Sequence, residues 1–142
     1  MKFCLLLFLT ILSVVVAQPP PPGGLIAGGF EDLKPGDFAD RAWKSAEKIN
    51  AGINGNTWFV PIKVLKARTQ VVAGTNTELE VLVGESSCSK TTKISEVTVK
   101  NCQFKKGGSR AVFKVSIWEK PWEKFEQVTA EKIRDVGAAE II

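Results

Sequence analysis

The chain has 142 residues, enough for one domain, and its 44% hydrophobic and 24% charged residues are typical of a globular protein. It contains no histidine and no tyrosine, which excludes Ser-His-Asp and Cys-His catalytic sites, imidazole-ligated zinc sites and tyrosine nucleophiles. The 19 basic and 15 acidic residues are interleaved, so we do not expect nucleic-acid binding. We expect neither an enzyme nor a bound cofactor or metal.

The first 17 residues predict a secretory signal peptide. Lys2 supplies a positive start, residues 3–16 are an almost unbroken apolar run, and Ala17 is a small residue suited to signal peptidase. A membrane anchor is the alternative, but this run is shorter than the about 20 apolar residues that a spanning helix needs. We therefore expect cleavage after Ala17 and a secreted, extracellular mature chain that does not associate with membranes.

Cysteine usage agrees with an oxidising compartment. Cys4 leaves with the signal peptide, so the mature chain keeps Cys88 and Cys102, which predict one disulfide. Two free thiols or half of a metal site are the alternatives, and the lack of histidine disfavours the metal site. Closing a loop of about 15 residues stabilises a fold by roughly 3 kcal/mol in the chain-entropy model.

A proline- and glycine-rich arm follows the signal peptide. Residues 18–29 cannot pack a core and predict an extended, solvated segment. Just before Gly28, the apolar residues Ile26 and Ala27 interrupt this arm, which is unusual for a spacer. We treat residues 30–142 as a single domain.

That domain begins with a helix predicted from Asp37 to Ile53. Its apolar residues recur at helical spacing, namely Phe38, Ala42, Ala46, Ile49 and Ile53. The turn sequence Asn54-Gly55-Asn56 ends the helix.

From residue 57 the apolar period changes to two, which predicts strands. In the first strand, Leu65, Ala67, Thr69 and Val71 are expected on one face of the sheet; in the second, Leu79, Val81 and Val83 alternate with Glu78 and Glu80. A turn at Ala73-Gly74 places Lys66 beside Glu80 and Arg68 beside Glu78, and opposite charges favour this register by about 0.2–1 kcal/mol a pair. Pro61 indicates a bulge or an edge position early in the first strand.

Two more strands complete the expected sheet. Residues 111–118 alternate, with Phe113, Val115 and Ile117 inward, and a turn at residues 119–123 leads into a returning strand at 124–129. Residues 130–142 are weakly patterned and are assigned no element. One helix on an antiparallel meander makes an α+β fold.

Three segments share apolar or small residues that this fold does not require. They are Ile26 to Gly29 on the arm, residues 70–74 at the first hairpin, and Pro121-Trp122 at the second hairpin. An arm that precedes the helix can lie beside the strand ends, and the two hairpin turns fall at the same end of the sheet. We expect these segments to form one apolar wedge.

These segments resemble the three conserved elements of the cystatins. Gln70-Val71-Val72-Ala73-Gly74 is similar to their QxVxG signature, Gly28 to their amino-terminal glycine, and Pro121-Trp122 to their second-loop dipeptide, in the same order. The chain is most similar to secreted type 2 cystatins, in particular those of nematodes. The resemblance implies one long helix packed on a curved four- to five-stranded antiparallel sheet.

The resemblance also implies a function. Type 2 cystatins are reversible, non-covalent, competitive inhibitors of papain-like (C1) cysteine proteases such as cathepsins L, S and B. By resemblance, Ile26 and Ala27 fill unprimed subsites, Gly28 turns the chain away from the catalytic cysteine, and the hairpins block the primed side. The alternatives are a cystatin-fold binding or immunomodulatory protein that does not inhibit proteases, and a carboxylate-dependent hydrolase.

Three further expectations come from comparison with this family. Asn54 matches the position by which some type 2 cystatins bind legumain, but Gly55 follows it and a plain Asn-Gly turn is favoured. A second disulfide of the family is missing, with Phe113 and Ile133 at its positions, so an apolar core contact between them is expected in its place. We expect a monomer, with a dimer domain-swapped about Val71-Val72 as the alternative.

Overall fold

A computed structural model describes residues 28–142 of the chain. The predictions for residues 1–27, which include the signal peptide, Ile26 and Ala27, lie outside the described residues. Within them, five strands form one antiparallel sheet whose spatial order follows the chain: β1 (Phe30–Leu33), β2 (Thr57–Val72), β3 (Gly74–Ser89), β4 (Arg110–Lys120) and β5 (Phe125–Val136). Over the same range, no helix is both long and apolar enough to cross a membrane. The α+β prediction is confirmed.

The helical segment begins and ends two residues earlier than predicted and is interrupted. It consists of η1 (Pro35–Phe38), α1 (Ala39–Lys44) and α2 (Ala46–Ala51). At Ser45 the hydroxyl donates a 2.8 Å hydrogen bond to the Arg41 carbonyl oxygen, and the Ser45 amide is shared between the carbonyls of Arg41 and Ala42 at 3.1 Å each. Such side-chain bonds to the preceding turn bend helices. The prediction of one long, continuous helix was therefore wrong.

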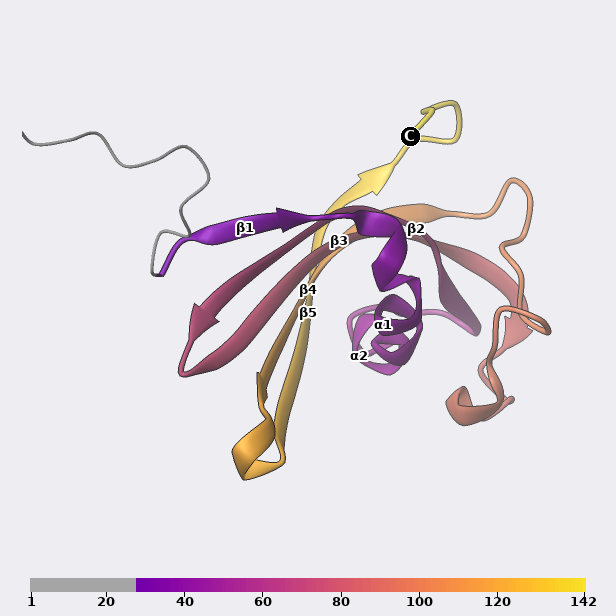
Figure 1. The fold of residues 1–142 in the computed structure, drawn as a ribbon. Helices are drawn as coiled ribbons and strands as arrows, with labels where there is room; N and C mark the ends of the chain where they lie inside the picture. Colours follow the sequence, from indigo (N-terminus) through magenta and orange to yellow (C-terminus); the bar gives the residue numbers. More distant parts are fainter. Residues whose placement is uncertain (1–27) are drawn as a thin grey trace, which may run out of the picture.

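The main core lies between the helices and the inner face of the curved sheet (Figure 1). The apolar residues of the predicted alternations are at most 3% exposed in β3 and β4: Leu79, Val81, Val83, Phe113, Val115 and Ile117. Ala42 and Ile49, from the predicted helix stripe, are fully buried against them. The two predicted alternations are therefore confirmed.

One facing prediction in β2 was wrong. Leu65 packs with Leu82 and Val112 on the outer face of the sheet, whereas Val64 joins Ala67 in the main core. The cause is an irregularity in the β2–β3 register between Val64 and Lys66, since an extra residue reverses the alternation. A second register shift follows Pro61, where the sequence predicted a bulge.

The predicted register of the first hairpin is confirmed. Lys66 pairs with Glu80 and Arg68 with Glu78, and their charged groups approach to 3.6 Å and 2.5 Å. Glu78 also lies 3.7 Å from Lys114 on β4. The same carboxylate therefore links three neighbouring strands.

The predicted disulfide joins Cys88 to Cys102, with their Cα atoms 5.6 Å apart. It closes a loop beyond the end of β3 that contains the short helix η2 (Ile94–Glu96). Trp58 attaches this loop to β2, because its indole N–H donates a 2.8 Å hydrogen bond to the Thr92 carbonyl oxygen.

The last strand and the C-terminal segment extend beyond the prediction. β5 continues to Val136, and the following residues turn back over the outer face of the sheet, where Ile142 packs on the cluster of Leu82, Val112 and Val136. Arg134 forms a two-point ion pair with Glu140, and Arg110 donates to the carbonyls of Gly137 and Glu140. The C-terminal segment is thus part of the fold.

The expected contact between Phe113 and Ile133 is absent from these described strands. Phe113 is 1% exposed in the main core, but Ile133 is 49% exposed. A register shift beside Phe113 pairs it with Lys132 and pairs Val112 with Arg134, which leaves Ile133 outside the pairing. That prediction was wrong because a bulge, invisible in the sequence, rotates Ile133 outward.

Candidate functional site

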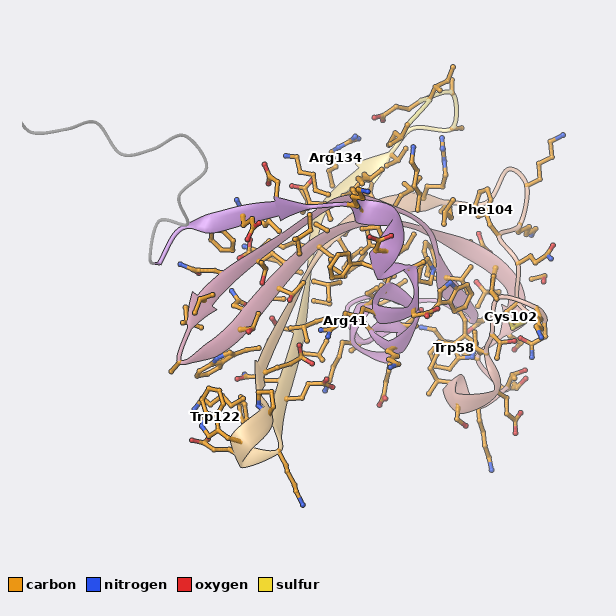
Figure 2. All side chains as sticks on the ribbon, in the orientation of Figure 1. Arg41, Trp58, Cys102, Phe104, Trp122 and Arg134 are labelled. Carbon is orange, nitrogen blue, oxygen red and sulfur yellow. A yellow bond between two sulfur atoms is a disulfide. The ribbon has the colours of Figure 1, made fainter. Side chains whose placement is uncertain are left out.

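The described members of the three segments lie at one end of the sheet. Figure 1 shows the start of β1, the β2–β3 hairpin and the β4–β5 hairpin on the same side of the molecule, opposite the disulfide loop. Trp122 extends from the tip of the second hairpin, while Cys102 lies at the far side (Figure 2). We call Gly28, residues 70–74 and Pro121-Trp122 the wedge.

The first hairpin of the wedge exposes apolar side chains. Val71 is 68% exposed and Val72 is 41% exposed, although both are large hydrophobic residues. The chain reverses at Gly74, whose φ of +95° is a conformation that glycine adopts without strain. The hairpin therefore ends in a narrow tip whose apolar side chains remain exposed.

Gly74 also meets the neighbouring strand. A Cβ atom at this position would collide with the carbonyl oxygen of Glu119 and approach Lys120. The glycine therefore allows β3 and β4 to pack against each other at the wedge. This is a requirement of the protein's own structure, separate from any approach to a partner.

The second hairpin is closed by a short turn. The 3₁₀ helix η3 (Pro121–Glu123) precedes Lys124, which takes the left-handed conformation with a φ of 51°. Trp122 is left 68% exposed by this turn. A large, rigid aromatic side chain held outward is typical of an interface residue.

The arm is attached to the first hairpin by Gln70. Its side-chain amide donates a 2.5 Å hydrogen bond to the carbonyl oxygen of Gly28. The short strand β1 continues this attachment, with Phe30 opposite Gln70 and its ring beneath the Arg68 guanidinium at 4.1 Å. The sequence did not predict β1, because its four mostly exposed residues show no period of two.

Asn54 lies elsewhere. It is exposed in the bend between α2 and β2, and β2 then runs 16 residues to reach the first hairpin. Gly55 beside it has a φ of +125°, as a turn glycine allows. The structure thus does not bring Asn54 together with the wedge.

The wedge presents a narrow surface with exposed apolar side chains. Among the described residues, no group of three or more histidine, cysteine, aspartate or glutamate side chains could hold a metal ion. Away from the wedge, where β5 meets the C-terminal segment, mutual hydrogen bonding lowers the pKa of Glu140 and raises the pKa of Arg134.

A five-stranded antiparallel meander wrapped around a helical segment, with an arm and two hairpins at one end, defines the class of cystatin-like folds. Residues 28–135 match the Cystatin domain family model. The chain belongs to the cystatin family.

Individual relatives agree with this assignment. The chain is 50% identical to cystatin cpi-1 of Caenorhabditis elegans over 137 residues, which cover 95% of this chain and 99% of that protein. It is 34% identical to onchocystatin of Onchocerca volvulus over 73% of this chain and 65% of that protein. The crystal structure of Al-CPI is similar with a TM-score of 0.62 and 38% identity, over 74% of this chain and 99% of that one.

A more distant structure shows the fold alone. Dimeric human cystatin F is 20% identical, with a TM-score of 0.62, over 84% of this chain and 97% of that chain. Cystatins are protease inhibitors and not enzymes, so the expectation of a non-catalytic protein is confirmed.

Proposed function

We propose that this protein is a secreted, reversible and competitive inhibitor of papain-like (C1) cysteine proteases, cathepsins L, S and B among them. The observation that carries the proposal is the wedge: three exposed apolar side chains, Val71, Val72 and Trp122, lie on two adjacent hairpins at one end of the sheet.

The mechanism follows from the shape of this surface. The two hairpins enter the active-site cleft on its primed side and exclude the substrate. Ile26 and Ala27 occupy the unprimed subsites, and Gly28 turns the chain between the two sides. No peptide bond lies in a cleavable register, so the inhibitor is released intact.

The affinity comes mainly from the hairpins. Trp122 buries a large aromatic surface at small cost in side-chain entropy, and Val71 and Val72 add apolar area. Because sheet pairing already orders the hairpins in the free protein, little freedom is lost on binding.

Titration of active papain and cathepsin L with the oxidised chain 18–142 tests the proposal. We expect reversible nanomolar inhibition that weakens by at least 100-fold in Trp122→Ala and in Val71→Asp, a cost in the range of interface hot spots. The control is Val99→Asp, because Val99 is similarly exposed, at 61%, and belongs to the disulfide loop, which lies on the side of the molecule opposite the wedge (Figure 1). A folded wild type that inhibits neither enzyme would instead be a binding module with the cystatin fold.

Secretion is tested on the released protein. Expression of the full sequence in a eukaryotic secretory host should yield a product in the medium whose first residue is Gln18. A product that stays in the cell, or that begins at Met1, would contradict the signal peptide.

A further inference from the structure

We propose that Trp118 is a positioning residue that fixes the first hairpin of the wedge onto the second, so that both enter a protease as one body. The inference rests on the proposed function, because it concerns how the same wedge is kept in its binding shape. Trp118 belongs to neither hairpin turn, and the sequence patterns did not single it out.

The main contact is a hydrogen bond between the hairpins. The indole N–H of Trp118, on β4, donates to the carbonyl oxygen of Ala73 at 2.9 Å. Ala73 is the turn residue of the first hairpin, flanked by the last pair of the β2–β3 ladder, Val72 and Gly74. The side chain thus anchors the carbonyl at the tip, beyond the point where β3 and β4 pair.

The indole ring is itself held from the second hairpin. Phe125, the first residue of β5, meets Trp118 edge to face with the ring centroids 5.2 Å apart. The Lys120 ammonium lies 4.7 Å from the Trp118 centroid and 5.2 Å from that of Phe125. These contacts fix the ring on both strands that flank the second turn, so the bond to Ala73 joins one hairpin to the other.

The position of Trp118 in the sheet allows its indole to contact the first hairpin. Trp118 pairs with Asn76 in the β3–β4 ladder, and with Val72 these two residues line an open apolar hollow between the hairpins. The hairpins therefore leave a gap on this face that the indole spans. Without its N–H group, the first tip keeps the packing of Gly74 on Glu119 and the β3–β4 ladder, which begins at Thr75, but no hydrogen bond from a β4 side chain to the Ala73 carbonyl.

The chain offers a matched control in Trp58. Its indole N–H also donates to a loop carbonyl, that of Thr92, at 2.8 Å, and the Lys90 ammonium lies 5.5 Å from its ring centroid. This arrangement repeats the chemistry of Trp118, and Trp58 lies on the side of the molecule opposite Trp122 (Figure 2). Replacing either tryptophan with phenylalanine keeps an aromatic ring and removes the same donor.

The test measures papain inhibition by Trp118→Phe and Trp58→Phe, each with its melting temperature. We expect Trp118→Phe to weaken inhibition by about three- to tenfold, the usual worth of one net hydrogen bond, and Trp58→Phe to leave inhibition unchanged. Phenylalanine retains most of the ring surface, so a direct contact of the ring with the protease is largely preserved.

A double-mutant cycle separates positioning from a general structural effect. Trp118→Phe is combined with Val71→Asp, which disables the first hairpin, and separately with Trp122→Ala, which disables the second. If Trp118 acts by holding the first hairpin, its substitution should still weaken inhibition beside Trp122→Ala but have no further effect beside Val71→Asp. An equal loss in both backgrounds overturns the proposal.

A measurement on the free protein makes the proposal independent of inhibition. Amide ¹⁵N relaxation of residues 72–75 should show lower order parameters in Trp118→Phe than in the wild type, and unchanged ones in Trp58→Phe. Unchanged order at these amides overturns the proposal. If instead the tip becomes mobile but the wild type does not inhibit papain, the proposed function fails while the structural role of Trp118 stands.

Discussion

Gly74 and the carbonyl group of Glu119 are packed so closely that no side chain fits between them, because a Cβ atom on residue 74 would overlap the oxygen. The glycine of the first hairpin is therefore fixed by β4, the strand that leads to the second hairpin. One residue serves both the turn and the packing of the two halves of the wedge.

The first prediction separates these two requirements on Gly74. Gly74→Ala should destabilise the fold by roughly 1–2 kcal/mol for the positive φ and by roughly 1–3 kcal/mol more for the overlap with Glu119. Gly107→Ala is the control, since Gly107 has a φ of +81° but nothing within 4 Å of its would-be Cβ atom. Chemical denaturation measures the free energy of unfolding of both variants. Equal losses of unfolding free energy in the two variants would show that the overlap with Glu119 is relieved at no cost.

The second prediction concerns the positions of the missing second disulfide. Phe113→Ala should cost about 3–5 kcal/mol of unfolding free energy, because a buried ring leaves a cavity in the core. Ile133→Ala should change it by no more than about 0.5 kcal/mol, because this side chain is largely exposed. A large effect at Ile133 would mean that the two positions do make the contact the sequence suggested. We also expect a lower melting temperature than that of a two-disulfide cystatin under matched conditions.

The third prediction concerns the C-terminal segment. The hydrogen bonds from Arg134 lower the pKa of Glu140 in the folded protein. A lowered folded-state pKa means that this pair stabilises the fold above the unfolded pKa of the carboxyl group, and that its contribution disappears as the pH falls through the folded pKa. NMR titration of the Glu140 side chain should show a lowered pKa in the wild type and a less lowered pKa in Arg134→Gln, where the Gly137 amide and the Arg110 charge still act on the carboxylate.

The control for this titration is Lys132→Gln. Lys132 pairs with Asp135 on the same strand and not with Glu140, so its loss should leave the Glu140 titration in place. An identical Glu140 titration in the wild type and Arg134→Gln would contradict the pairing.

The sequence predicted the β3 and β4 core faces and the first hairpin register, because alternation and opposite charges are local signals. The prediction of which side chains face the core failed at two strand irregularities, one beside Leu65 and one beside Phe113. At each, one extra residue moves the neighbouring side chains to the other face of the sheet, and no residue there marks the insertion. The interruption of the helix at Ser45 could not be predicted either, because serine is also compatible with an unbroken helix.

The position of the exposed wedge residues at one end of the sheet was predicted, whereas the contacts that connect the two hairpins were not. Val71, Val72 and Trp122 could be found because large apolar residues at turns need an explanation. Trp118 could not, because its position in an alternating strand gives no sign that its indole reaches the Ala73 carbonyl. Contacts between hairpins depend on how the sheet curves, which local patterns do not encode.

The last prediction concerns Gln70, whose amide holds the Gly28 carbonyl. Gln70→Met removes the donor and keeps the length of the side chain, so Gly28 should lose its fixed position beside the first hairpin. Inhibition of cathepsin L by the chain 18–142 should weaken by about three- to tenfold, as for the loss of one hydrogen bond. The same substitution in a chain that begins at Phe30 should have no effect on inhibition, because the acceptor is gone.

The comparison between the two chain lengths decides the role of Gln70. Gln103→Met, at an exposed glutamine directly after Cys102, controls for the change of residue type. If Gln70→Met weakens the long and the short chains equally, Gln70 acts within the first hairpin and not on the arm. A loss confined to the long chain means that one side-chain amide couples the arm to the hairpin, and with the Trp118 indole it would make three separate segments a single binding surface.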